Sequence, residues 1–414
     1  MQNQGVAAIA MRNHFKNIEV LFPKDFNLNK IVQMQAEEAF SENAISFLNA
    51  LSILLRNDPQ STDFPEIAAF AFFCRKANLI QLKKVYSPPA NRRTGRGIVF
   101  HISPSNMPMN FAYSLVSGIL SGNLNIVRLP SKKFKQVDMV CQAIQELSEK
   151  AEFQLFSQRM LLVRYDKLSS ATACFSSICD ARIIWGGDQA VREIKKISLS
   201  AKAIDVSFGD KYSICVMNAD KYIHERSPKK IARAFYNDTF LFDQNACTSP
   251  HLIVWLGSGK NVSASQQLFW DHLYNLVKKR YHLQAHSAID KLSTFYNQAI
   301  HLKGIKKTPM PDNLIWRIEL QELTDSLDKY RGNCGYFVEY KASSLPELSC
   351  IICKKHQTIA SYGIEKEEWL QLSRQLKLNV NDRIRSIGKT SEFSLSWDGY
   401  NLIDTLSKAL PIIL

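Results

Sequence analysis

The feature that most restricts the fold of this chain is a regular alternation of short apolar runs and amphipathic segments between residues 98 and 185. Four of the runs have the length of buried strands: Ile98–Ile102, Leu124–Leu129, Leu161–Arg164 and Arg182–Trp185. Two intervening segments, Met109–Leu120 and Lys132–Lys150, repeat their apolar residues at helical spacing. Repeated strand–helix–strand units predict a parallel sheet of the doubly wound type, which binds ligands at the carboxyl ends of its strands.

A second block with the same alternation begins near Ile231 and runs through Leu376. It contains a predicted strand at Leu252–Leu256 and a predicted helix at Gln266–Tyr281, and helical periodicity at Lys30–Arg56 precedes the first block. A chain of 414 residues is long enough to bury two cores. We therefore expect an α/β protein with two doubly wound parallel-sheet domains. The expected division is residues 1–230 for N-terminal helices and a cofactor-binding domain, 231–395 for a catalytic domain and 396–414 for a C-terminal segment.

The net charge of +14 favours anionic partners. The basic residues are spread among acids, and the sequence contains no arginine-rich arm, zinc-finger spacing or aromatic RNA-binding motif. We therefore expect attraction for phosphorylated cofactors or acyl thioesters rather than nucleic acid. No apolar run is long enough to span a bilayer, and Met1–Lys16 lacks the pattern of an export signal, so a cytoplasmic protein is expected.

The nine cysteines are scattered without a disulfide framework, and their odd number argues against paired bridges. Cys350 and Cys353 have C-x-x-C spacing, but the apolar context of residues 348–353 is typical of a buried strand. No second pair at metal-ligand spacing accompanies them. A structural role is therefore favoured over zinc binding or redox chemistry.

Cys247 has a different setting from the other cysteines. It follows a polar turn at residues 243–245 and precedes Pro250 and an apolar strand. A thiol at a loop-to-strand junction is held by the scaffold yet open to a substrate, which is the placement that a nucleophile needs. Because free cysteines often act as small buried hydrophobes, a packing role stays open. His251 could stabilise the thiolate, or it could simply pack at the start of the strand.

The loop after the first strand opens with four candidate cofactor or substrate contacts: Ser103, Pro104, Ser105 and Asn106. Prolines stiffen this loop, and its other side chains offer neutral hydrogen-bonding groups. In the next helix, the small residues Ser114, Gly118 and Gly122 recur every four positions. Such a stripe permits either a flat ligand or tight packing of the helix on the sheet.

Basic and small residues follow two further strands. Arg128, Ser131 and Lys132 lie at the end of the second strand and before a helix, where they suit a phosphate, although a solvated helix start explains them equally well. A basic residue near the ribose suits the 2′-phosphate of NADP, whereas an acid there favours NAD. Gly186 and Gly187, after the fourth strand, could turn backbone N–H groups toward a pyrophosphate, although no G-x-G-x-x-G occurs.

In order and spacing, these segments resemble the aldehyde dehydrogenase superfamily. The resemblance is carried by Ile102–Pro108, Gly122–Val127 with Pro130–Ser131, Gly186–Gly187, Phe208–Lys211 and Gln244–Cys247. A more specific similarity is to the acyl reductases of the LuxC family, which include the fatty-acid reductase of bacterial bioluminescence. It rests on Phe240–Cys247 and Trp397–Ile403, supported by Asp382–Ile384 and Gly388–Lys389, and covers roughly residues 95–410.

The resemblance implies an aldehyde-dehydrogenase-like fold and a thioester mechanism. Cys247 would attack an activated acyl group, and a hydride from NADPH would then release an aldehyde from the resulting thioester. Asn106 and the backbone N–H of Cys247 would stabilise the oxyanion. The implied cofactor-binding residues are Ser103, Pro104, Ser105, Arg128, Ser131, Lys132, Gly186 and Gly187.

The chain departs from the superfamily pattern at informative positions. Ser207 stands where hydrolytic aldehyde dehydrogenases carry a glutamate, so no obvious base activates water, and the thioester should persist for reduction or transfer. Leu129 and Lys132 stand at the ribose-binding lysine and glutamate, which favours NADPH over NADH. Residues 331–335 offer no counterpart of a later cofactor-binding glutamate, and Trp397–Tyr400 is interpreted as a structural turn that closes the catalytic domain.

The expected substrate is acyl-CoA or another acyl thioester, and an acyl-protein synthetase or acyltransferase could deliver it. Self-association is expected from the superfamily. Two other functions compete with acyl reduction. An aldehyde dehydrogenase working in the oxidative direction would release acid, and a non-catalytic basic binding protein would leave Cys247 unlabelled and bind nucleic acid in a salt-dependent way.

Overall fold

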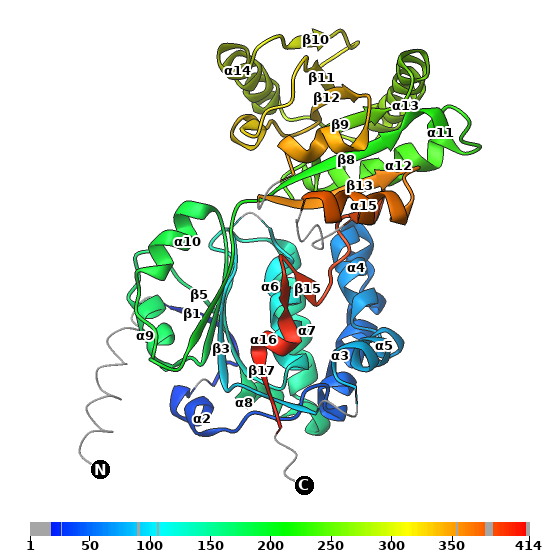
Figure 1. The fold of residues 1–414 in the computed structure, drawn as a ribbon. Helices are drawn as coiled ribbons and strands as arrows, with labels where there is room; N and C mark the ends of the chain where they lie inside the picture. The colour runs from blue at the N-terminus through cyan, green and yellow to red at the C-terminus, as the bar shows by residue number, and fades with distance from the viewer. Residues whose placement is uncertain are drawn as a thin grey trace. The chain divides into compact units, whose positions relative to one another are not determined.

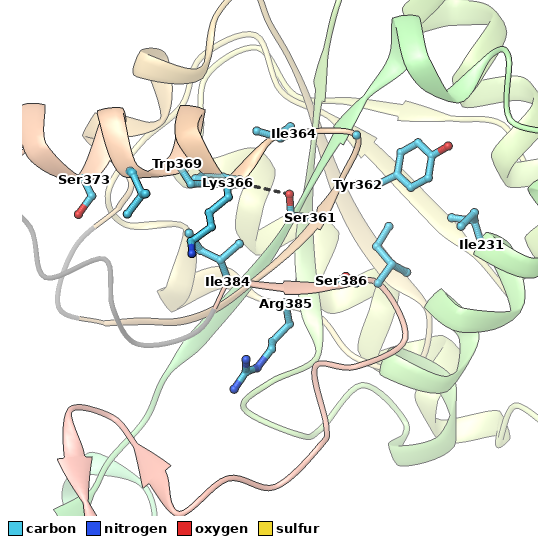
Figure 2. Close-up of a pocket in the computed structure, with 13 residues that line it drawn as sticks. Ile231, Ser361, Tyr362, Ile364, Lys366, Trp369, Ser373, Ile384, Arg385 and Ser386 are labelled. Atoms are coloured by element: carbon cyan, nitrogen blue, oxygen red, sulfur yellow. Dashed lines mark hydrogen bonds between the residues drawn. The ribbon is translucent and has the colours of Figure 1, made fainter. Parts of the chain in front are cut away.

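The structure, a computed structural model, describes residues 18–25, 27–88, 92–105, 107–352, 355–376 and 384–410. The chain divides into two compact units (Figure 1). Met1–Gly209 and Phe393–Leu414 make up the first unit, and Asp210–Glu392 make up the second. The change of unit lies earlier in the chain than the division expected at residue 230, because β8 (Tyr212–Asn218), which the sequence analysis did not identify, pairs with β9 (Pro250–Leu256) in the second sheet.

The first unit is built on a six-stranded sheet in the order β1-β5-β4-β3-β6-β7. Its strands are β1 (Glu19–Phe22), β3 (Ile98–Ile102), β4 (Leu124–Arg128), β5 (Met160–Arg164), β6 (Ala181–Trp185) and β7 (Ile204–Phe208). All neighbouring strands are parallel except β1, which runs antiparallel to β5. The four strands predicted from apolar runs are confirmed.

Helices cover both faces of this sheet, with α6 and α7 on one side and α9 and α10 on the other (Figure 1). The helices of this unit are α2 (Leu28–Gln33), α3 (Glu42–Asn57), α4 (Pro65–Phe73), α5 (Lys76–Tyr86), α6 (Asn110–Leu120), α7 (Lys135–Ser148), α8 (Phe156–Arg159), α9 (Ala171–Ile178), α10 (Asp188–Lys195) and α16 (Leu402–Leu406). Val127 on β4 packs in the core beside α6 and α7, while Ile126 packs in the core that contains Phe175 of α9. Burial on both faces explains the continuous apolar runs.

The C-terminal residues complete the first unit. β17 (Ser407–Ala409) pairs with β2 (Arg93–Gly95), and β15 (Ser396–Trp397) forms a hairpin with β16 (Tyr400–Asn401). Positive φ angles at Asp398 (46°) and Gly399 (82°) form the hairpin turn. The predicted turn therefore exists, but the expectation that it closes the catalytic domain is wrong, because the Trp397 ring packs 6.2 Å from Trp185 within the first unit.

The second unit contains a seven-stranded sheet in the order β10-β11-β12-β9-β8-β13-β14. Its remaining strands are β10 (Lys306–Thr308), β11 (Trp316–Glu319), β12 (Tyr336–Ala342), β13 (His356–Tyr362) and β14 (Ile384–Ser386). Only β10 is antiparallel to its neighbour. The helices are α11 (Ala219–Tyr222), α12 (Pro228–Thr239), α13 (Gly259–Arg280), α14 (Ala285–His301) and α15 (Lys366–Leu376). The predicted α/β class with two largely parallel sheets is confirmed.

The helical periodicity over Lys30–Arg56 corresponds to two helices, α2 and α3, because residues between them bond to the end of α6: Glu37 N–H donates to Gly122 O (2.8 Å) and Phe40 N–H to Leu120 O (2.7 Å). One local prediction is wrong, because the buried strand expected at residues 348–353 is absent. Leu345–Cys350 forms a 3₁₀ helix with a capping box at its start, and Cys350 is exposed, while Cys353 lies outside the described residues.

Candidate active site

The carboxyl edge of the first sheet gathers the residues predicted to bind the cofactor. Ser103, Pro104 and Ser105 follow β3, Arg128 ends β4, and the Gly186–Gly187 pair follows β6. Since β4, β3 and β6 are adjacent and parallel, these groups lie along one edge. The Ser103 N–H donates to the Arg128 carbonyl (3.1 Å), which ties the first two loops together.

The turn between β4 and α7 suits a phosphate. Ser131 and Lys132 are exposed, and α7 begins without a side-chain N-cap, so its first backbone N–H groups are available to an anion. The hydroxyl of Ser103 is buried and has no partner among the described residues, which leaves a polar group for a ligand to engage. These features fit a phosphorylated dinucleotide.

Arg164 supports this turn, and sequence reasoning missed it. Its guanidinium is buried; Nε donates to the Pro130 carbonyl (3.1 Å), and Nη1 pairs with Glu19 (3.0 Å). Arg128 is partly engaged, because its guanidinium carbon lies 4.9 Å from the centre of the Tyr165 ring. An arginine that ends a buried strand could have signalled such a role, because a buried charge requires partners.

The Gly186–Gly187 turn and the β4–α7 turn both precede a helix that has no side-chain N-cap and has an acid in its first turn, Asp188 in α10 and Asp138 in α7. Neither glycine has a positive φ, and Gly187 is the N-cap of α10. The first turn of α10 carries the acidic Asp188, which already complements the helix dipole.

A buried hydrogen-bond chain positions the strand that precedes the glycine pair. Trp185 Nε1 donates to Ser114 Oγ (3.0 Å). Asn125 Oδ1 can only accept, so His101 Nε2 donates to it (3.0 Å), and Nδ1 of the neutral ring accepts from the Ser114 hydroxyl (2.8 Å). Burial lowers the pKa of His101 to about 4, which keeps the imidazole neutral. A Cβ at Gly118 would overlap Asn125, so close packing of helix and sheet explains the small residues of α6.

Cys247 lies in the second unit, in a loop between α12 and β9, and is half-buried. The loop begins with two consecutive residues of positive φ, Asp243 (50°) and Gln244 (60°). The buried Gln244 amide makes four hydrogen bonds to the backbone. Its Nε2 donates to Pro250 O and Tyr336 O (both 3.0 Å), and its Oε1 accepts from the N–H groups of Gly335 (3.0 Å) and Tyr336 (3.1 Å).

Neighbouring side chains hold the rest of the cysteine loop. The Ser213 hydroxyl donates to the Cys247 carbonyl (2.6 Å), and the Ser249 hydroxyl donates to the Asp238 carbonyl (2.7 Å). Before the cysteine, Tyr281 OH donates to the Asp243 carboxylate (2.6 Å). The backbone around Cys247 is therefore fixed from both sides, although only its sequence neighbours were visible as a motif.

His251 does not supply a positive charge to the thiol. The imidazole is buried, its Nδ1 bonds to the Gly332 carbonyl (2.9 Å), and its ring stacks on Tyr212 with centroids 5.6 Å apart. Burial, reinforced by the positive charge of Arg331, lowers the pKa of His251 to about 3. The imidazole is thus neutral and packed, which is the packing role considered for His251 and not the stabilisation of a thiolate.

The remaining predicted residues are placed as follows. Asn106 lies outside the described residues. Ser207 is half-buried on β7, and its neighbours on that strand, Val206 and Phe208, are apolar.

Among the described residues there is no cluster of three or more side chains that could hold a metal ion, and none of the described helices has the length and apolar content needed to cross a bilayer.

The sequence signature of the family described as acyl-CoA reductase (LuxC) matches residues 21–409. The chain belongs to the LuxC acyl-CoA reductase family. Membership places it among the aldehyde-related oxidoreductases. No individually curated protein matches the sequence.

Solved structures of aldehyde dehydrogenases share the fold of this LuxC-family chain. Aldehyde dehydrogenase 21 from Physcomitrella patens is 12% identical with a TM-score of 0.65, covering 88% of this chain and 84% of that one. The NAD-dependent benzaldehyde dehydrogenase from Corynebacterium glutamicum is 12% identical with a TM-score of 0.61, covering 92% and 86%. AldH from Staphylococcus aureus is 11% identical with a TM-score of 0.57, covering 88% of each chain. At such identities the likeness establishes the fold.

Proposed function

We propose that this protein reduces an activated fatty acyl group to an aldehyde with NADPH, through a thioester on Cys247. The observation that carries the proposal is the match to the LuxC family over residues 21–409. The construction of the cysteine loop supports it, because four hydrogen bonds from Gln244 and one from Ser213 fix the backbone that presents the thiol.

In the first half-reaction, the Cys247 thiolate attacks the acyl carbonyl carbon. A new carbon–sulfur bond forms, the bond to the donor's sulfur breaks, and the donor thiol leaves with a proton. We assign to Asn106 and the Cys247 N–H the donation of hydrogen bonds to the oxyanion. Fixing the loop matters because a nucleophile gains most of its advantage from correct orientation before attack.

In the second half-reaction, the thioester carbon is reduced and its bond to Cys247 breaks, which releases the aldehyde and regenerates the Cys247 thiolate. A bound nicotinamide supplies the hydride for this step. On the first unit, Ser103, Arg128 and Lys132 would hold the cofactor. Further contacts to the cofactor are proposed for Pro104, Ser105, Ser131, Gly186 and Gly187. The exposed basic turn before α7 favours NADPH, since it can meet a 2′-phosphate.

Reduction is favoured over oxidation to an acid because the chain has Ser207 where a water-activating carboxylate would be needed. A serine hydroxyl is too weak a base to deprotonate water at neutral pH. The thioester therefore survives until a hydride or a second thiol reaches it. We further propose that acyl-CoA or an acyl group delivered by a partner enzyme is the donor, and that the reaction takes place in the cytoplasm.

The test is the intact mass of the protein after mixing with acyl-CoAs of several chain lengths, followed by addition of NADPH. Wild type should gain one acyl group, which NADPH then discharges as aldehyde, and Cys247→Ala should gain none. Asn106→Ala should acylate roughly a hundredfold more slowly, because it removes one oxyanion donor.

An acyl adduct on Cys247→Ala would locate the nucleophile elsewhere and end the proposal. Discharge of the wild-type adduct as free acid, without NADPH consumption, would identify a hydrolytic enzyme instead. Absence of any adduct calls for a repeat with acyl-adenylate donors, and failure there as well would remove Cys247 from the chemistry.

A further inference from the structure

Helix α14 (Ala285–His301) turns its large apolar side chains toward solvent. The exposed fractions are 67% for Ile289, 43% for Leu292, 58% for Tyr296 and 78% for Ile300. No other helix among the described residues carries as many exposed large hydrophobic side chains. Single exposed hydrophobic residues are ordinary, but a continuous stripe along one helix marks a contact surface.

The face by which α14 attaches to its unit combines buried polar side chains with Phe295, whose ring lies 6.3 Å from that of Trp316. Lys291 is buried and its Nζ donates to the carbonyls of Asn313 (2.7 Å) and Leu314 (3.1 Å). Gln298 is buried too, donating to Tyr330 O and accepting from Tyr336 OH (both 2.6 Å). The helix is therefore anchored by these hydrogen bonds and by Phe295, and the folding of the unit does not account for the apolar residues on the outer face.

The spacing of the outer face fits a second helix. Ala285, Ile289, Leu292, Tyr296 and Ala299 follow one another at intervals of four, three, four and three residues. Ile300, beside Ala299, extends this set, so that the exposed apolar residues form one face along the whole helix, as packing against a second helix requires.

The flank of the stripe argues against a lipid surface. A helix that lies on an anionic bilayer carries lysines and arginines beside its apolar face. The exposed flank of α14 instead carries His286, Asp290, Ser293 and Asn297. The only lysine of the helix, Lys291, is buried against the unit.

The net charge of the chain indicates what could cover the exposed face of α14. The chain has a net charge of +14, so two copies repel one another except where the surface lacks cations. Helix α14 itself exposes no lysine or arginine, and the exposed lysines nearest to it in the chain, Lys303, Lys306 and Lys307, lie beyond its C-terminal end. We propose that α14 is a homotypic interface, in which the α14 helices of two copies pack antiparallel across a twofold axis.

Antiparallel packing sets Leu292 of one copy against Tyr296 of the other, twice, at the centre of the contact. It also opposes the two helix dipoles, and it separates the two Asp290 carboxylates, which a parallel pair would bring together. Four side chains of about 200 Å² each, weighted by their exposure, offer roughly 500 Å² per copy and about 1,000 Å² per pair, the lower limit for a specific interface. Association should therefore be reversible and depend on concentration.

The test is sedimentation velocity of the full chain over a wide concentration range. Ile289→Glu combined with Ile300→Glu should remove one association step, so that the mass reached at high concentration is half that of wild type. The matched control is Val85→Glu combined with Leu168→Glu, which places the same charges on side chains of the first unit that are 72% and 86% exposed. The control should associate as wild type does.

Wild-type mass at every concentration for the α14 variant overturns the proposal, provided that both variants unfold cooperatively. Geometry is tested by mixing Leu292→Cys and Tyr296→Cys proteins with a short bis-maleimide and sequencing the crosslinked peptides. A 292–296 crosslink supports the antiparallel pair, and a 292–292 crosslink without it contradicts the pair. Binding of wild type, but not of the α14 variant, to phosphatidylserine vesicles in the absence of self-association would assign the stripe to a bilayer.

Discussion

The loop that carries Cys247 and the turn that carries Lys132 are built in opposite ways. In the cysteine loop, a buried glutamine makes four hydrogen bonds to backbone groups, and a serine hydroxyl holds the carbonyl of the cysteine itself. In the basic turn, Ser131 and Lys132 are exposed, and the helix that follows begins without a side-chain cap. The cysteine loop is held in place by hydrogen bonds within the protein, whereas the basic turn leaves its hydrogen-bond donors available to a ligand.

The contrast follows from what each region would do. A nucleophile must be oriented before its substrate arrives, because misplacement lowers the rate of attack directly. A phosphate site must instead keep its hydrogen-bond donors unpaired until an anion binds. Substitutions in the cysteine loop should therefore reduce chemistry and stability together, whereas substitutions in the basic turn should alter the choice of cofactor and leave the fold intact.

Gln244→Ala should have the largest effect. It removes the partners of two backbone carbonyls and two backbone N–H groups in a buried site, so the free energy of unfolding should fall by roughly 3 kcal/mol. With its anchor lost, the loop should misplace the thiol and slow acylation of Cys247 about a hundredfold. Urea denaturation and a time course of intact mass with acyl-CoA measure the two effects.

Gln266→Ala is the matched control for this variant. Gln266 is also a buried amide of the second unit, but it donates to Glu339 (3.0 Å) and makes no bond to the cysteine loop. It should lose stability without slowing acylation. Equal slowing by both variants would show that general loosening of the unit, and not the position of the loop, limits the reaction.

Lys132→Glu should act on cofactor choice. Replacing the cation by an acid should weaken binding of NADPH at least tenfold more than binding of NADH, because a charged hydrogen bond is worth about 1.5–3 kcal/mol. Fluorescence titration with each cofactor measures the ratio. Lys150→Glu makes the same charge change after the end of α7 and should leave the ratio unaltered; equal weakening of both cofactors by Lys132→Glu would remove Lys132 from this selection.

Much of the fold could be predicted because buried parallel strands leave a simple trace in the sequence. The run Ile98–Ile102 became a strand with the predicted bounds, and the runs at residues 161 and 182 each gained one residue at their start. The interruption between α2 and α3 could not be predicted. It depends on hydrogen bonds from Glu37 and Phe40 to the end of α6, and their partners lie some eighty residues further along the chain.

The candidate site divides in the same manner. Cys247 could be singled out because a polar turn before a thiol and a strand is a local pattern. The part played by Gln244 could not, since its partners are backbone atoms of Pro250, Gly335 and Tyr336, and backbone atoms carry no sequence signal. The neutrality of His251 was equally hidden, because it results from burial against Tyr212 and residues near 332.

His251→Asn should have the smallest effect on chemistry and a measurable effect on stability. Burial lowers the pKa of this imidazole from 6.5 to about 3, so the folded protein disfavours its protonation. The contribution of the neutral imidazole to the free energy of unfolding is fully present above pH 6.5 and is lost as the pH falls toward 3. At pH 5 the wild type should have lost about 2 kcal/mol from this group, and the variant should show a correspondingly flatter decline in urea denaturation between pH 7 and pH 5.

The same variant tests whether His251 activates the thiol. A neutral imidazole cannot stabilise a thiolate by charge, so the pH dependence of Cys247 alkylation by iodoacetamide should be the same in wild type and His251→Asn. The exposed His282 provides the control, since His282→Asn should not alter the alkylation profile. A shift of the alkylation profile to higher pH in His251→Asn alone would mean that the His251 imidazole is charged when Cys247 reacts. The cysteine loop would then differ from the basic turn not only in its fixed backbone but also in having a titrating group beside the thiol.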